Sequence, residues 1–175
     1  AGEQALHQRR HPVEQMLADS AAAPVLKERL ARAAQIRDFA SRELRLPDNG
    51  AYRSYADLGR PYALWNVVAA PEFSLQPVRS CFPIAGCVAY RGFYARGAAL
   101  RHAAALREAG NDVVVYGVPA YSTLGWFADP LLSTFVGYPD AELARLIFHE
   151  LAHQVAYAEN DSTFNESFAV TVERE

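Results

Sequence analysis

The feature that most constrains this chain is a pair of histidines, His149 and His153, four residues apart in a largely apolar segment. In an α-helix, four residues correspond to about 400° of rotation and about 6 Å of rise, so both imidazoles leave the same face. A Zn²⁺ ion binds histidine nitrogens at about 2.0–2.1 Å, and two histidines one turn apart can share one ion. The spacing therefore predicts two ligands of a zinc site.

Glu150 completes the pattern His-Glu-x-x-His. On a helix it lies at the flank of the histidine face, where its carboxylate can reach a metal-bound water. This pattern is typical of zinc peptidases, in which the glutamate is the general base. The alternative is a buried helix whose two histidines are satisfied by hydrogen bonds. The rest of the chain must therefore supply a third ligand and a supporting sheet.

The segment around the two histidines has the features of a buried helix. Pro139, Asp140 and Glu142 suit a helix N-terminus, where acidic side chains meet the positive end of the helix dipole. Apolar residues then recur at steps of four, at Leu143, Ile147, Leu151 and Val155. This stripe predicts packing against a sheet. Polar groups on such a helix must be paired, and a metal ion would pair the histidines.

Length and composition restrict the class of protein. A chain of 175 residues is most simply one domain, and we expect a helical N-terminal segment (residues 1–46) followed by a main domain (residues 47–175). Because 51% of the residues are hydrophobic and the net charge is only −3, neither disorder nor nucleic-acid binding is favoured. No apolar run reaches the length of a membrane span.

Periodicity and turn residues predict an α+β fold, with helices that precede and flank a small mixed sheet. We expect helices at residues 4–17, 24–46, 95–109 and from 163 past the end of the chain, and a short helix or loop at 131–135. Strands are expected at residues 62–69, 74–78, 86–90 and 112–118, with an edge strand at 121–127. The histidine helix should be followed by a second helix that carries the third ligand.

Cys81 and Cys87 are the only cysteines. They could close a short loop as a disulfide, which would imply an oxidising compartment. Two reduced, partly buried thiols are an equal alternative. Their spacing does not match a Cys-x-x-Cys zinc or redox pair.

A third zinc ligand is expected downstream of His153, because catalytic sites of this kind use three protein ligands and leave one position for water. Glu166 is the preferred candidate, since an adjacent antiparallel helix could bring it to the metal. Thr163-x-x-Glu166 also reads as a capping box, in which Glu166 would instead bond the backbone of Thr163. Glu159 is the second candidate, and Asp161 and Glu173 are the other acids in this region.

The motifs together resemble a known family. Asn165-Glu166-x-Phe168-Ala169 after the histidine motif resembles the gluzincin pattern of aminopeptidase-N-like enzymes. Residues 47–175 more closely resemble a family of predicted bacterial zinc aminopeptidases. The matching stretches include Leu46-Pro-Asp-Asn-Gly, Tyr52-Arg-Ser-Tyr-Ala-Asp-Leu-Gly-Arg-Pro61, Cys81-Phe-Pro-Ile-Ala-Gly-Cys87 and Val118-Pro-Ala-Tyr-Ser-Thr-Leu-Gly-Trp-Phe127.

The resemblance implies a zincin-like fold and one Zn²⁺ ion held by His149, His153 and Glu166, with Glu150 as the catalytic base. It implies hydrolysis of a peptide or protein substrate, with no nucleic-acid partner. Members of the family are typically longer, exported lipoproteins. We therefore expect a periplasmic or cell-envelope location, a lipid anchor outside this chain as the only membrane contact, a truncated C-terminus and a Cys81–Cys87 disulfide.

The sequence also departs from the gluzincin pattern. Val170 stands where thermolysin-like enzymes place an aspartate that orients a ligand histidine, so Asp129 or Asp161 is expected to take that role. Residues 121–127 contain no acid to bind a substrate's free amine, so the prediction of a zinc hydrolase is stronger than that of an aminopeptidase.

Aromatic side chains supply the remaining candidates for the site. Tyr121 and Trp126 are candidates for lining the substrate subsites, although packing roles explain them equally well. The candidates for an oxyanion donor are Tyr121, Tyr157 and Tyr116.

A rival function is a non-catalytic cell-envelope protein that uses a metallopeptidase scaffold as a binding module. Glu150 argues against it, because a scaffold without activity has no chemical need for that acid. A purely structural zinc site usually closes with cysteine or a fourth histidine, and neither is nearby in the sequence.

Overall fold

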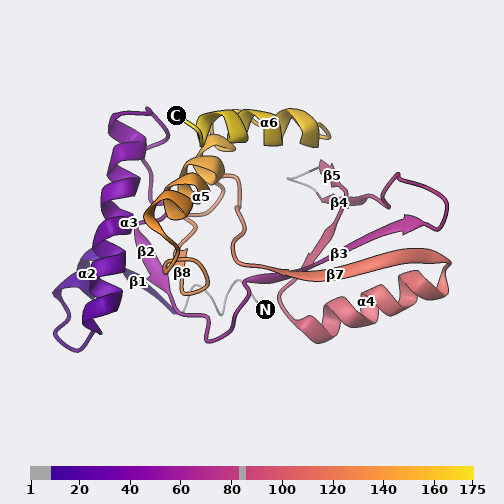
Figure 1. Ribbon diagram of the computed structural model, residues 1–175, viewed down its shortest axis with the longest axis horizontal. Coiled ribbons are helices and arrows are strands. Elements are labelled where there is room, and N and C mark those ends of the chain that lie inside the picture. The colour runs from indigo at the N-terminus through magenta and orange to yellow at the C-terminus, as the bar shows by residue number, and fades with distance from the viewer. Residues whose placement is uncertain (1–8, 83–85) are drawn as a thin grey trace. The chain divides into compact units, whose positions relative to one another are not determined.

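The computed structural model describes residues 9–82 and 86–175 (Figure 1). The described chain divides into two compact units, which we treat separately. Unit 1 consists of the described part of Ala1–Arg60 together with Ser122–Tyr157 and Thr163–Glu175. Unit 2 consists of the described part of Pro61–Tyr121 together with Ala158–Ser162. Helices and small sheets contribute to the structure, and the expected N-terminal helical segment lies within unit 1.

Unit 1 contains most of the helices. Its elements are β1 (Arg10–Pro12), α2 (Val13–Ala18), α3 (Pro24–Arg42), β2 (Ser54–Ala56), β8 (Leu131–Leu132), α5 (Asp140–Ala152) and α6 (Ser162–Val172), whose first residue belongs to unit 2. The three short strands form one sheet in the order β1-β2-β8. β2 pairs antiparallel with β1 and parallel with β8.

The two long helices of unit 1, α3 and α5, pack against each other (Figure 1). Pro24 occupies the first turn of α3, as predicted, because its fixed φ suits that position. The Phe39 and Phe148 rings stack across the two helices with 6.0 Å between centroids. The stripe of α5 is confirmed for Leu143, Ile147 and Leu151, which are 0–1% exposed. This stripe was predicted to pack against a sheet, but the main packing partner of α5 is helix α3.

A buried arginine on α3 organises the loop that follows this helix. Arg37 is fully buried, and its guanidinium donates hydrogen bonds to the main-chain oxygens of Ala51 (2.9 Å), Pro47 (2.6 Å) and Asn49 (3.3 Å). It also donates to the hydroxyl of Ser41. Burial, and then the charge of Arg53, lower its pKa from the ordinary arginine value. The guanidinium thus replaces water as the donor for three loop carbonyls.

Unit 2 is a small sheet covered by one helix. Its elements are β3 (Leu64–Pro71), β4 (Ser80–Phe82), β5 (Gly86–Val88), β6 (Arg91–Phe93), α4 (Arg96–Glu108) and β7 (Asn111–Val118). β3 lies between β6 and β7 and pairs antiparallel with both. α4 runs along this sheet (Figure 1), and its Ala99 and Ala103 pack against Val67 of β3. Gly110 follows α4 at φ +84°, as expected for a helix C-cap.

Several helix predictions need correction. Within residues 4–17, the described part begins with strand β1 and only then becomes helix α2. The helix expected at 24–46 ends at Arg42, because Arg45 has a left-handed φ of 55° that an α-helix excludes. α6 ends at Val172 rather than running past the end of the chain. Val155 lies outside α5 and is 54% exposed.

Three other predictions were wrong as well. Residues 74–78 form no strand, and residues 131–135 begin with β8 before a turn. The predicted edge strand at 121–127 is a loop, because Leu124 and Gly125 have left-handed φ angles of 55° and 82°, which interrupt an extended chain. Asp129 holds this loop by accepting hydrogen bonds from the Thr123 amide (2.8 Å) and hydroxyl (3.0 Å).

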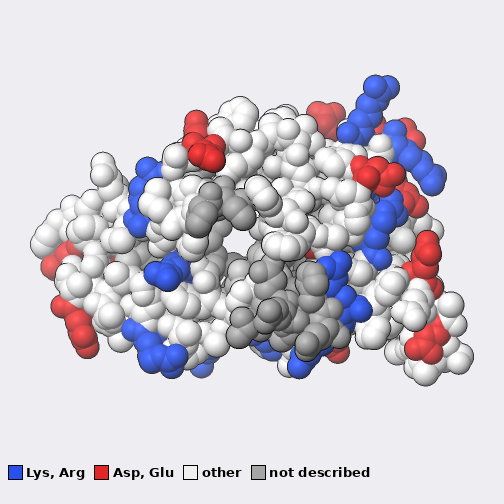
Figure 2. Space-filling model, turned by 180° about the vertical axis from the view of Figure 1, so that it is seen from behind, with Lys and Arg blue, Asp and Glu red and all other residues white. Residues whose placement is uncertain are grey.

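The two cysteines lie opposite each other in the β4–β5 hairpin and form a disulfide. The three residues 83–85 between these strands lie outside the described part. None of the described helices is both long enough and apolar enough to cross a membrane. On the face shown in Figure 2, basic and acidic side chains are interspersed.

Candidate metal centre

Helix α5 presents both motif histidines near its C-terminal end. The predicted start at Pro139 and Asp140 is confirmed, with Pro139 as the N-cap and Asp140 and Glu142 in the first turn. His153 is the C-cap residue but keeps right-handed helical angles, φ −61° and ψ −20°. The regular one-turn spacing therefore reaches His153, and the two imidazole centroids lie 4.8 Å apart.

The two imidazoles and the Glu166 carboxylate converge on one point. His149 Nε2 and His153 Nε2 are 3.2 Å apart. Glu166 of α6 places Oε2 3.2 Å from His149 Nε2 and Oε1 3.8 Å from His153 Nε2. Within the described residues, these three form the group whose ligand atoms all lie within 4.8 Å of one another. They could hold one metal ion.

The chemistry of these three donors fits a zinc ion. Two neutral imidazoles that direct Nε2 lone pairs at the same point repel each other unless a proton or a cation lies between them. Two nitrogens and one carboxylate oxygen are a ligand set that catalytic zinc sites use, with one position left open. His153 is buried, and its Nδ1 has no hydrogen-bond partner among the described residues. Its Nε2 faces His149 Nε2, where a shared cation would satisfy both nitrogens.

The position of the Glu166 side chain favours one of the two roles predicted for it. Its carboxylate lies against the two imidazoles, as the ligand interpretation predicts, rather than against the backbone of Thr163. Glu159, the alternative ligand, is exposed and belongs to unit 2.

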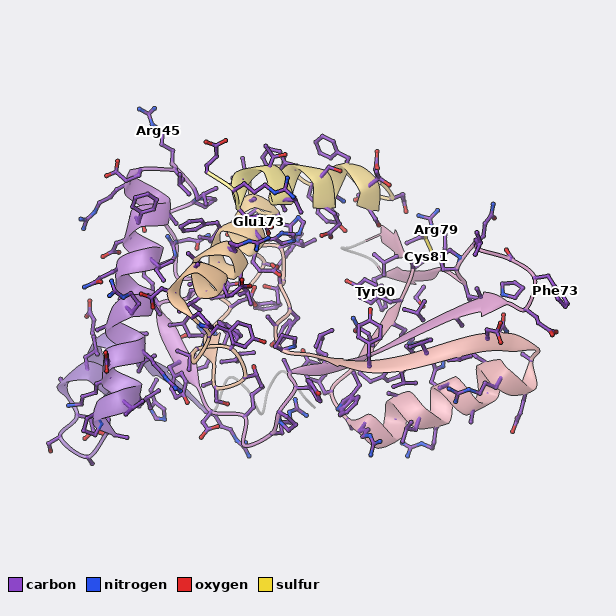
Figure 3. All side chains as sticks on the ribbon, viewed as in Figure 1. Arg45, Phe73, Arg79, Cys81, Tyr90 and Glu173 are labelled. Atoms are coloured by element: carbon purple, nitrogen blue, oxygen red, sulfur yellow. A yellow bond between two sulfur atoms is a disulfide. The ribbon has the colours of Figure 1, made fainter. Side chains whose placement is uncertain are left out.

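Glu173, near the end of the chain, orients His149. Its Oε2 lies 2.9 Å from His149 Nδ1, and its Oε1 accepts a hydrogen bond from the Arg145 guanidinium at 2.9 Å. Figure 3 shows this side chain beside α5. A carboxylate at Nδ1 favours the tautomer with the proton on Nδ1, which leaves the Nε2 lone pair for a metal. Asp129 and Asp161 were the expected candidates for orienting a histidine, and Glu173 is a carboxylate that contacts His149 Nδ1.

We expect Glu173→Ala to weaken zinc binding about 10- to 100-fold, because it removes the group that orients His149. A competitive chelator titration of the purified protein measures this affinity. Glu142→Ala is the matched control. Glu142 also pairs with Arg145 (3.9 Å), but among the described residues it forms no ion pair with His149. Equal zinc affinities for the two variants would contradict the orienting role.

The charges of the cluster respond to one another in the metal-free protein. The hydrogen bond with Glu166 is the main cause that raises the pKa of His149, to about 9. The same hydrogen bond lowers the pKa of Glu166, whereas burial lowers the pKa of His153.

Glu150 is partly buried. Burial is the main cause that raises its pKa to about 7, and the carboxylates of Glu166 and Asp129 add to this effect. A hydrogen bond from Ser122 partly offsets the rise, and the Ser122 hydroxyl also accepts the Leu124 amide at 3.1 Å. Ser122 lies in the loop found in place of the predicted edge strand. This loop therefore supplies a hydrogen-bond partner for Glu150, the predicted base.

The aromatic candidates separate between the two units. The Tyr157 ring lies edge-on to His153, with 6.3 Å between centroids. Trp126 is 66% exposed on the loop of unit 1. Tyr116 and Tyr121 belong to unit 2, where Tyr121 packs edge-on against Tyr94. Among the candidate oxyanion donors, Tyr157 is thus the one that shares a unit with the cluster.

Two residues were missed, and only for Glu173 did the sequence contain a signal. Glu173 follows Glu166 by seven residues, which is about two helical turns, so a helical path brings both to one side, and Glu173 directly follows α6. Asn49 lies in the predicted turn at 46–50, and its side-chain amide donates to Gln154 at 2.7 Å. No local signal connects Asn49 with Gln154, because they are 105 residues apart.

A comparison with known families identifies the family of this chain. A family model described as "putative aminopeptidase" matches residues 1–175. The chain belongs to this family, and the family description supports peptidase activity. No curated protein and no solved structure matches the chain.

Proposed function

We propose that this protein is a zinc-dependent peptidase with a zincin-like active site, and that it removes residues from the free amino end of peptides. The convergence of His149, His153 and Glu166 on one point carries the zinc part of the proposal. The family carries the choice of an aminopeptidase.

His149, His153 and Glu166 would hold the ion, and Glu173 would keep His149 in the ligating tautomer. Zn²⁺ bound there would supply Lewis acidity, which polarises the scissile carbonyl and lowers the pKa of water. Glu150, on the flank of the histidine face, takes a proton from the attacking water and gives one to the leaving amine. Tyr157 is the candidate donor to the oxygen that becomes negative during the attack.

Digestion of a peptide library with free and with blocked N-termini tests this proposal. We expect zinc-dependent loss of the first residue from free peptides and no cleavage of blocked ones. Internal cleavage of blocked peptides would replace the aminopeptidase by an endopeptidase. Zinc binding without any cleavage would favour the rival binding module.

The ligand assignment predicts opposite results for two glutamates. Glu166→Gln is expected to weaken zinc binding more than about 100-fold, since even changes outside the ligand shell cost about 10- to 100-fold. Glu159→Gln, which removes an exposed carboxylate close by in the sequence, should leave zinc affinity unchanged. Bound zinc is measured by elemental analysis after equilibration with a chelator. The reverse pattern would assign the third ligand to Glu159.

We also propose that the protein works in an oxidising compartment such as the periplasm or cell envelope. The Cys81–Cys87 disulfide supports this, since disulfides persist mainly in such compartments. We expect protein isolated from that compartment to react with a maleimide only after reduction, whereas protein made in the cytoplasm should react directly. Free thiols in the exported protein would contradict this proposal.

A further inference from the structure

A cavity of about 440 Å³ lies within unit 2, whereas the predicted metal ligands all belong to unit 1. Cationic and apolar side chains line it together. Its polar side includes Arg79, Arg91 and His102, and its apolar side includes Val67, Val78 and Leu106. The volume lies within the usual range for small-molecule sites, which begins at about 300 Å³.

Main-chain contacts hold Arg79 at one wall of this cavity. Its guanidinium donates to the main-chain oxygen of Cys87 at 2.8 Å and of Asn160 at 3.4 Å. Val78, the residue before it, donates its amide to Ala69 at the end of β3, at 2.7 Å. The disulfide further ties the β4–β5 hairpin, and Figure 3 shows Arg79 next to Cys81. Arg79 therefore presents its charge from a fixed position.

Arg91 and His102 form another part of the wall. Arg91 lies opposite Val67 in the β6–β3 register, and its guanidinium stacks over the Phe93 ring at 5.6 Å. The His102 ring lies against the same phenylalanine, with 5.2 Å between centroids. Burial, and then the charge of Arg91, lower the pKa of His102 from the ordinary histidine value.

Neither guanidinium group pairs with a carboxylate of residues 9–82 or 86–175. Among the described residues, no aspartate or glutamate forms an ion pair with Arg79 or Arg91. Two unpaired positive charges beside one cavity favour an anion, and a planar guanidinium is especially suited to a carboxylate. The aliphatic wall adds a preference for an apolar group next to that anion.

We propose that this cavity binds an organic carboxylate with an aliphatic body, such as the free carboxyl end of a peptide whose last residue is aliphatic. The carboxylate pairs with Arg79 and Arg91, and the aliphatic group lies against Val67, Val78 and Leu106. This site does not depend on zinc or on peptide hydrolysis.

Calorimetric titration of the zinc-loaded protein with N-acetyl-leucine tests the proposal. The paired probe is N-acetyl-leucinamide, which has the same body but no charge. We expect the acid to bind about tenfold more tightly than the amide, and Arg91→Gln to remove this difference. Arg91 is the better variant, because Arg79 also holds the hairpin together. Arg101→Gln, an exposed arginine on α4 outside the lining, is the matched control and should change nothing.

The alternatives give distinct results in the same titration. Equal binding of acid and amide would overturn the proposal. An equal loss of affinity for N-acetyl-leucine in Arg91→Gln and Arg101→Gln would also overturn it. The same holds if inorganic phosphate binds as tightly as N-acetyl-leucine. Acid binding that disappears in His153→Ala but survives in Arg91→Gln would place the carboxylate at the metal centre and would also overturn it. Thermal unfolding midpoints confirm that each variant is folded.

Discussion

Replacing Glu150 by glutamine should reduce turnover by a factor of about 10²–10⁴ while the protein keeps its zinc. Glutamine preserves the size and hydrogen-bonding shape of the side chain but cannot accept a proton from water. Glu150 does not belong to the His149–His153–Glu166 cluster, so the metal ligands remain in place. Steady-state rates on a free peptide and zinc content from the same preparation measure the two effects separately.

Glu142→Gln is the control for this experiment, because Glu142 lies in the first turn of the same helix and is exposed. Its turnover should equal that of the original protein. A Glu150→Gln variant that keeps both zinc and full activity would remove Glu150 as the base. A variant that loses zinc would show that Glu150 supports the ligands instead.

The largest expected effect on stability comes from Arg37. We expect Arg37→Met to lower the free energy of unfolding by about 3–5 kcal/mol. Methionine keeps much of the buried apolar volume but leaves the main-chain oxygens of Pro47, Asn49 and Ala51 without their donor. Such a loss is a large part of the roughly 5–15 kcal/mol that stabilises a typical domain. Urea unfolding of the metal-free protein measures it without the contribution of zinc binding.

Arg32→Met is the matched control on the same helix. Arg32 pairs with Asp140 at 3.0 Å, but both side chains are more than half exposed, so this ion pair is expected to contribute no more than about 1 kcal/mol. If Arg37→Met costs no more than Arg32→Met, the guanidinium is not needed to hold the loop.

Local features of the sequence were enough to predict the elements whose stabilising contacts are close along the chain. The start of α5 follows from Pro139 and the first-turn acids, and the shared face of His149 and His153 follows from helical geometry. The strand near Asp112 and the capped helix before Gly110 were also predicted correctly, as β7 and α4.

Predictions failed where a distant partner or a backbone angle decided the outcome. The aromatic stretch at 121–127 has the composition of a strand, but left-handed angles at Leu124 and Gly125 and the hydrogen bonds to Asp129 make it a loop. The fully buried Arg37 could not be foreseen, because arginine is almost always at least partly exposed.

The sequence alone determined that the two histidines share one helical face and that Glu150 is the acid beside them, since this relation depends only on the helical repeat. Only the tertiary structure decided that Glu166 meets both imidazoles and that Glu173 meets the far side of His149. These contacts join α5 to α6, and their geometry depends on how the two helices pack. The helical repeat does not specify that arrangement, because the turn after α5 decides where the second helix lies.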